Sequence, residues 1–421
     1  MIRVRENPSQ LNTNGQVQIK LLEDVSTRVL QSTFFGEEAG KISSGEANAF
    51  MGYQSGQKNR LGSFGVFVGF QAGQLNQNSD YNTFVGAYSG QYNNRGSRNT
   101  FVGFQAGQYN KDGSECTGIG AFALRENTIG LRNVAIGNRA GERMLDGDNN
   151  TIIGMESGQD IRSGNNNTMA GYRSGRATFR NNENTYFGAF AGYSNSFGDG
   201  NAFVGYRAGE NLIQGSFNVA VGIYALSRAK YGDCNIAIGA FAGSIATGDN
   251  SVFVGTGAGA ENLIGDNNTF LGMNAGYRSQ GSDNVYIGKN AACNLAGNRN
   301  VVIGVNAYED IQSDGSVIIG YRTGTTKFNF GNSNILIGIN ADTYTQRTSN
   351  AIVIGSKNTN AYTQSISIGE NIDNGGVNSL SIGYDINIDG DRTIIVGNQV
   401  DIKSVNVFAN RLTCLLHLEH G

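Results

Sequence analysis

Few residues in this chain could perform acid–base or nucleophilic chemistry. The only histidines, His417 and His420, lie next to the carboxyl terminus with no third metal ligand nearby. A Ser-His-Asp or Cys-His site in the body of the chain is therefore excluded. Carboxylates alone can cleave glycosidic bonds, but Glu210, Glu261 and Asp266 stand in polar segments where solvated charges are expected. We expect no enzymatic activity and no catalytic residue.

The cysteines and the remaining acidic cluster do not form a recognisable metal or cofactor site. The cysteines lack metal-type spacing and are expected to be reduced thiols: Cys116, Cys234, Cys293 and Cys414. Asp385, Asn387 and Asp389 resemble the first half of a calcium loop, but Val396 stands where such a loop needs a bidentate Glu. We expect no cofactor, and calcium binding stays an open alternative.

Composition narrows the class of protein. The 421 residues include 62 Gly and one Pro, and the formal charge is −3 with Lys and Arg spread thinly, which disfavours nucleic acid as a partner. Hydrophobic residues at 39% supply enough apolar surface for folding. The amino-terminal segment lacks the apolar stretch of a signal peptide, and no window is apolar enough for a membrane span. We expect assembly in the cytoplasm without membrane insertion.

A short repeat organises the chain and positions every polar group in it. A marker glycine recurs in 23 copies between Gly36 and Gly397, at intervals of 16 to 18 residues that shorten to 14 at the end. The corners of the repeat carry this glycine and, four residues before it, Asn in 14 of the 23 copies. Short amides at a recurring corner can bond neighbouring backbone and stack into ladders. The corner residues that represent both sets are Gly52, Gly69, Gly86, Gly103, Gly154, Gly205, Asn82, Asn99, Asn150, Asn167 and Asn201.

Two further positions of the repeat are restricted in size. The third residue after the marker is Ala, Ser or Thr in each of the first 19 copies, for example Ala72, Ser89 and Ala106. A second glycine often follows at the fourth position, as at Gly73 and Gly107, which suits a corner that needs positive φ or close approach.

Two consecutive apolar positions precede the marker glycine. The residue directly before it is apolar in all 23 copies, and the residue two before it is often Phe. Since neighbouring strand residues point to opposite faces, the pair predicts a strand covered on both sides. We expect the row directly before the glycine to fill a narrow lumen and the Phe row to point away from it. The predicted core and interface residues are Phe50, Phe67, Val68, Phe84, Val85, Phe101, Val102, Ile136, Ile153, Phe203, Val204, Ile238, Phe253, Phe270, Ile303, Ile337, Ile354, Ile368 and Ile382.

The period excludes helical repeats and predicts an all-β, parallel β-solenoid with one coil per copy. A unit of 14 to 18 residues is too short for two helices or for a helix, a strand and their loops. Coils stacked at the inter-strand distance predict a rod of about 105 Å. We expect an N-terminal cap or docking segment in residues 1–32, the repeat domain in 33–397 and a C-terminal cap in 398–421.

An outward column of Phe would leave an apolar stripe that one soluble chain does not tolerate. Self-association about the rod axis is the simplest cover, because identical coils then meet at identical heights. The apolar stripe thus predicts self-association of the rod, and we expect the assembly to be a homotrimer.

The number of chains is implied by a resemblance of two kinds of repeat copy to known protein families. The copies Ser365-Ile-Ser-Ile-Gly369 and Ser379-Leu-Ser-Ile-Gly383 resemble the head repeats of trimeric autotransporter adhesins, and Asn82-Thr-Phe-Val-Gly86 is similar to repeats of phage tail fibres and other viral fibre proteins. The resemblance implies a left-handed β-roll wound as a homotrimer. The chain shows no signal peptide, heptad stalk or carboxy-terminal barrel, which favours the viral fibre over the bacterial adhesin.

We therefore expect a structural fibre or spike on a virion or phage-like particle, with other particle proteins as partners. Its loops would face outward and contact a host-surface receptor or glycan. The alternative is a glycan-binding adhesin head, with sugars stacking on Tyr88, Tyr92, Tyr109 and Tyr193. Ice binding is a third alternative, but the row of Thr three before the marker is interrupted by Val134 and Val219.

Overall fold

A computed structural model describes residues 2–3, 31–261, 265–308, 312–325, 331–343, 348–360, 363–388 and 391–402. These residues form an all-β, parallel β-solenoid of about 20 turns, and none of them lies in a helix. The prediction of the fold class is confirmed at this level. The chain divides into two compact units, Met1–Phe241 and Ala242–Gly421, which are described separately.

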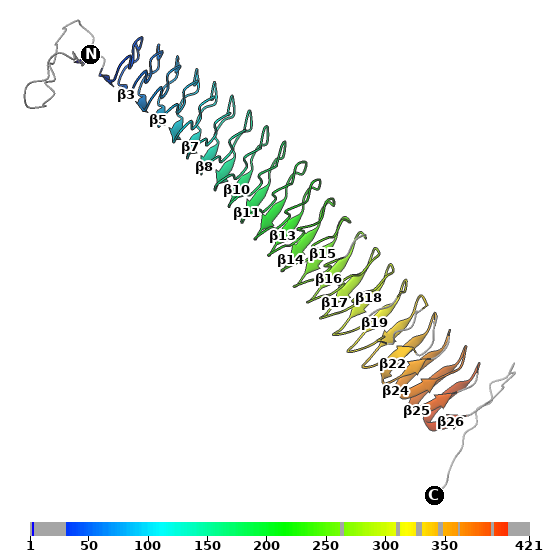
Figure 1. The fold of residues 1–421 in the computed structure, drawn as a ribbon. Helices are drawn as coiled ribbons and strands as arrows, with labels where there is room; N and C mark the ends of the chain where they lie inside the picture. The colour runs from blue at the N-terminus through cyan, green and yellow to red at the C-terminus, as the bar shows by residue number, and fades with distance from the viewer. Residues whose placement is uncertain are drawn as a thin grey trace, which may run out of the picture. The chain divides into compact units, whose positions relative to one another are not determined.

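In the first unit each strand from β2 to β13 pairs in parallel with the strand one coil further along the chain (Figure 1). The register is one complete period, so that Thr83, Phe84 and Val85 lie opposite Thr100, Phe101 and Val102. The strands are β2 (Thr33–Phe35), β3 (Ala49–Met51), β4 (Val66–Val68), β5 (Thr83–Val85), β6 (Thr100–Val102), β7 (Thr117–Ile119), β8 (Val134–Ile136), β9 (Thr151–Ile153), β10 (Thr168–Ala170), β11 (Thr185–Phe187), β12 (Ala202–Val204), β13 (Val219–Val221) and β14 (Ile236–Ile238).

Each three-residue strand ends at the marker glycine, whose conformation explains why the position does not vary. Gly86 has φ +129°, and a Cβ atom placed on it would lie 2.4 Å from the carbonyl oxygen of Gly103 in the next coil. Real Cβ atoms do not approach an oxygen that closely, so a side chain here would separate the coils. In the first unit the chain then passes through turns before the next strand begins.

The middle residue of each strand forms the core, which corrects the predicted orientation of the two apolar rows. Phe50, Phe67, Phe84 and Phe101 are at most 1% exposed within a single chain. Their rings stack coil upon coil with centroids 4.5, 4.8 and 5.4 Å apart. Because a strand alternates its faces, the residue directly before the glycine points outward instead. The row directly before the glycine, which was predicted to fill the lumen, therefore points outward. The Phe row fills the lumen.

The core positions on the return side of the coil are small, as the repeat predicted. Ala72, Ser89 and Ala106 are fully buried. Gly73 has φ +56°, and a Cβ atom on it would lie 2.7 Å from the ring of Phe67. The predicted corner thus needs glycine for close approach to the aromatic core.

The asparagines four residues before the marker form a buried ladder, as predicted. Asn99 accepts a hydrogen bond from the backbone N–H of Cys116 at 2.9 Å and donates one to the carbonyl of Gly113 at 2.8 Å. It is fully buried, and Asn82 makes the matching bond to the N–H of Asn99 one coil earlier. Each amide therefore joins its own coil to the next one.

The second unit repeats this ladder and then changes to longer strands. Its last three strands have nine residues each, matching the shortened 14-residue period, and pair in parallel through Ile368 opposite Ile382. Its strands are β15 (Val252–Val254), β16 (Thr269–Leu271), β17 (Val285–Ile287), β18 (Val301–Ile303), β19 (Val317–Ile319), β20 (Ile335–Ile337), β21 (Asp342–Thr343), β22 (Ile352–Ser356), β23 (Thr359–Asn360), β24 (Ile366–Asn374), β25 (Leu380–Ile388) and β26 (Ile394–Ile402).

The predicted terminal caps fall largely outside the described residues. At the amino end, β1 (Ile2–Arg3) pairs in parallel with β2, with Ile2 opposite Thr33. At the carboxyl end, the last described strand runs to Ile402, five residues beyond the final marker glycine, Gly397. Residues 4–30 and 403–421, which hold the rest of both predicted caps, are not described.

Candidate functional site

The outward row of the first unit leaves large apolar side chains exposed along the ladder. We call these residues the outer sheet face and define it by those large apolar residues directly before and after the marker glycines that are at least 37% exposed in the single chain. Their exposed fractions lie between 37% and 60% in the single chain. The face comprises Phe35, Met51, Tyr53, Phe70, Phe104, Ile119, Ile136, Ile153, Met155, Phe187, Val204, Tyr206, Val221, Ile223 and Ile238.

The strand register aligns members of the outer sheet face in neighbouring coils, although the coils of Gly86 and Gly171 contribute none. Ile136 lies opposite Ile153 in the ladder, and Val204 lies opposite Val221. Taking a little under half of each side chain as exposed, the face amounts to on the order of 1,000 Å². The largest apolar patch on a typical monomer is about 300–600 Å². This face therefore has the size and character of an interface.

A second feature lies on the returns of the coils, where the sequence placed candidate sugar-binding tyrosines. The structure brings Tyr92 and Tyr109 together, with ring centroids 5.2 Å apart and an interplanar angle of 10°. Tyr88 lies elsewhere, with its ring edge-on to those of Phe70 and Phe104. The four tyrosines thus do not form one surface.

The fourth tyrosine is held by its own neighbours. The hydroxyl of Tyr193 accepts a hydrogen bond from the guanidinium of Arg176 at 3.1 Å, and its ring lies 5.8 Å from that of Phe190. Tyr193 is therefore part of a local arginine–aromatic cluster, apart from the Tyr92 and Tyr109 pair.

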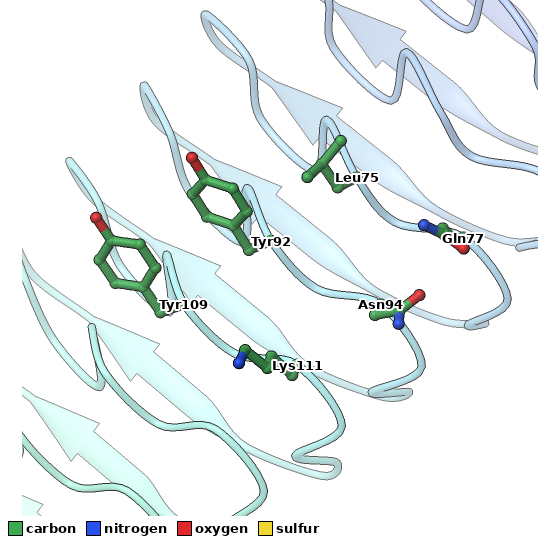
Figure 2. Close-up of a pocket in the computed structure, with 6 residues that line it drawn as sticks. All are labelled: Leu75, Gln77, Tyr92, Asn94, Tyr109 and Lys111. Atoms are coloured by element: carbon green, nitrogen blue, oxygen red, sulfur yellow. The ribbon is translucent and has the colours of Figure 1, made fainter.

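The Tyr92 and Tyr109 pair borders a shallow hollow of about 230 Å³ (Figure 2). Figure 2 shows two parallel rows on three successive coils, with Leu75, Tyr92 and Tyr109 in the first row. The second row consists of Gln77, Asn94 and Lys111. Each row advances by 17 residues per member, so the repeat itself builds the site. Sequence reasoning named the two tyrosines and missed the second row, although the same 17-residue interval connects its members.

Three polar side chains around this hollow have no side-chain partner in the described part of the chain. Within the part of the chain that the structure describes, the side-chain amides of Gln77 and Asn94 and the ammonium of Lys111 make no hydrogen bond or ion pair. Gln74 and Gln91, one row away, instead bond to each other at 3.1 Å in a closed amide ladder. The hollow is therefore a place where the solenoid leaves hydrogen-bonding capacity open.

The carboxylates named from the sequence are engaged as ordinary surface charges. Glu261 pairs with Arg278 at 2.6 Å, and Asp266 accepts a hydrogen bond from the backbone N–H of Asp249 at 2.9 Å. Glu210 lies 3.7 Å from Arg207; partial burial raises the pKa of its carboxyl, and Arg207 acts in the opposite direction. None of these contacts resembles an acid–base pair aimed at a bound substrate.

The cysteines occupy different environments. Cys116 is fully buried and replaces Asn in the amide ladder, and burial raises the pKa of its thiol to about 11. Cys234 is exposed, Cys293 is half-buried, and all three are free thiols. Cys414 lies outside the described residues, as do His417 and His420.

The described ranges hold neither a cluster of metal ligands nor a membrane-spanning helix. No group of three or more His, Cys, Asp and Glu side chains there is placed to hold a metal ion. In the calcium-like segment Asp385 accepts a hydrogen bond from Asn371, and Asp389 is not described. The same ranges contain no helix of the length and hydropathy needed to cross a bilayer.

Comparison of the chain with protein-family models and with curated proteins gave no match to either. The fold of the chain is the parallel β-solenoid. The features that bear on its function are the outer sheet face and the hollow on the returns.

Proposed function

We propose that the chain is a non-enzymatic structural fibre or spike protein whose rod is built by lateral self-association, as a homotrimer. The observation that carries the proposal is the outer sheet face, which is apolar, recurs over most coils of the first unit and is uncovered in the single chain. It replaces the Phe column as the reason for association, since that column is satisfied inside one chain.

Self-association fits this face better than an unrelated partner does. Its residues recur once per coil at the spacing of parallel strands, about 4.8 Å. A second copy of the chain carries the same spacing, so equivalent coils meet at equal height around an axis parallel to the ladder. The estimated area exceeds the roughly 800 Å² that one partner buries in a standard interface. The number three rests on the resemblance to trimeric adhesin heads and viral fibres.

The particle role is the further step of the proposal. Stacked coils with closed hydrogen-bond ladders favour a stiff shaft, and the returns are free to carry recognition groups outward. The marker glycines continue at the spacing of the repeat from Gly239 to Gly255. We place this rod on the surface of a virion or phage-like particle, bound to other particle proteins and directed at a host.

The decisive experiment is the molar mass and shape of the purified chain in solution. Light scattering should give three times the 44.7 kDa chain mass, and small-angle X-ray scattering should give an elongated particle. A monomeric mass over the working concentration range would contradict association through the outer sheet face. A compact particle would contradict the fibre.

A further inference from the structure

The hollow shown in Figure 2 lies on the returns of the coils and is lined by Leu75, Gln77, Tyr92, Asn94, Tyr109 and Lys111. We propose that it binds an acidic oligosaccharide, a sugar chain bearing a carboxylate, laid along the direction in which the coils stack. This inference does not depend on self-association or on the particle role.

The aromatic row offers partly open ring faces. Parallel rings touch at a separation of about 3.5–4.0 Å, whereas the centroids of Tyr92 and Tyr109 are 5.2 Å apart at an angle of 10°. The two rings are therefore not in full face-to-face contact, and the guanidinium of Arg125 lies 5.5 Å from the centroid of the Tyr109 ring. Their exposed fractions of 39% and 37% agree with this geometry. A stepped aromatic surface of this kind packs against the C–H faces of sugar rings.

The second row supplies the polar contacts that fix a hydroxyl-rich ligand. Gln77 and Asn94 each present an amide able to donate and accept, and neither amide is bonded within the described structure. The hydroxyls of Tyr92 and Tyr109 are likewise unbonded there. A few convergent polar groups around an apolar floor are the usual composition of a small-molecule site.

The charge of the site favours an acidic sugar. Lys111 is the charged residue among the six that line the hollow, and its ammonium has no ion pair in the described chain. The nearby carboxylate of Asp112 is taken by Arg95, whose Nε lies 3.0 Å from it. A carboxylate on the ligand is the partner that Lys111 lacks.

A peptide does not fit the same site by strand addition. The backbone N–H groups of Gln77 and Asn94 already donate to the carbonyls of Asn94 and Lys111 in the next coil, at 3.2 and 2.9 Å. Tyr92 likewise donates to Gln108 at 2.9 Å. No open strand edge remains on this side for a peptide to extend, so recognition has to come from side chains.

The test uses the full chain on an array of immobilised neutral, sialylated and uronic-acid-containing oligosaccharides, followed by titration calorimetry with the best acidic hit. We expect binding to acidic members. The Tyr92→Ala/Tyr109→Ala variant should weaken it at least about tenfold, because the stacking surface is lost. Lys111→Gln should weaken binding to acidic sugars and remove the preference over neutral ones.

The chain offers a matched control in Phe64 and Tyr81, which are also exposed and stacked, at 4.9 Å, but do not line the hollow. Tyr81→Ala should bind as the unmodified chain does. Tyr92→Phe keeps the ring and removes the hydroxyl. Its binding of the acidic sugar therefore tests the contribution of the hydroxyl, even if the double alanine variant fails to fold. Silence of the array, or acidic-sugar binding unchanged in the tyrosine and Lys111 variants, would overturn the proposal.

Discussion

Gly73 packs against the face of the Phe67 ring, so closely that a Cβ atom on Gly73 would lie 2.7 Å from it. One position of the repeat thus limits the size of the other. Two coils show the opposite arrangement: Gly118 and Ala220 take the place of the Phe, and Leu124 and Leu226 take the place of the glycine. Leu124 is fully buried and has φ +49°, so a left-handed leucine is accepted at this corner when the aromatic ring is absent.

The first prediction follows from this exchange of volume. Gly73→Leu alone should lower the free energy of unfolding by about 1–3 kcal/mol through overpacking. Phe67→Gly alone should lower it by about 3–5 kcal/mol, as loss of a buried aromatic side chain does. The double variant reproduces the Gly118 and Leu124 arrangement and should cost clearly less than the two together. Denaturant unfolding followed by circular dichroism measures all three, and strict additivity would argue against the exchange.

The second prediction concerns the buried amide ladder. Asn99→Ala should lower the free energy of unfolding by about 1–3 kcal/mol, because the N–H of Cys116 and the carbonyl of Gly113 lose their partner. Asn78 is exposed on a return, so Asn78→Ala is the control and should leave the thermal midpoint unchanged. Equal effects of the two substitutions would show that the ladder adds nothing to stability.

The third prediction is a pH dependence from Cys116. Since burial raises the pKa of this thiol to about 11, the folded chain holds the proton more tightly than the unfolded chain does. Its contribution to stability should be complete below about pH 9 and be lost as the pH rises to about 11, by up to about 2–3 kcal/mol. Cys116→Asn, which restores the amide of the neighbouring coils, should lack this component, so the comparison is the difference between the two unfolding profiles.

The fourth prediction tests the outer sheet face. Ile136→Glu with Ile153→Glu places two charges in adjacent coils of the proposed interface and should shift the molar mass from trimer towards monomer in sedimentation velocity. The same change at Asn78, on an exposed return, should leave the mass unaltered. A variant that stays trimeric would place the contact on another surface.

The sequence was sufficient to predict the repeat, the parallel coils and the corner residues. Glycine and asparagine at fixed offsets have direct physical causes, which Gly86 and Asn99 show in the structure. The orientation of the two apolar rows was predicted wrongly, because consecutive apolar residues do not show which of them faces the lumen. The true core position varies from Phe101 to Gly118 and Ala135, since the opposite side of the coil compensates for its size.

The candidate site was only partly accessible to the same reasoning. Tyr92 and Tyr109 could be named because aromatic residues on polar returns are conspicuous. Gln77, Asn94 and Lys111 could not, because many amides of the repeat look equivalent in sequence while some are tied into ladders, as Gln91 is through Gln74. Which amides remain open depends on side-chain pairing between coils.

The backbone of each coil bonds to the coil before it and the coil after it, as Gly103 does to Val85 at 2.8 Å. Duplication or loss of one whole period therefore leaves every remaining junction of the same kind. The number of periods therefore sets the number of coils. Recombination between similar repeats can change that number without requiring a new kind of contact between coils. In the proposed fibre, the number of coils and the sugar-binding hollow can therefore change independently of each other.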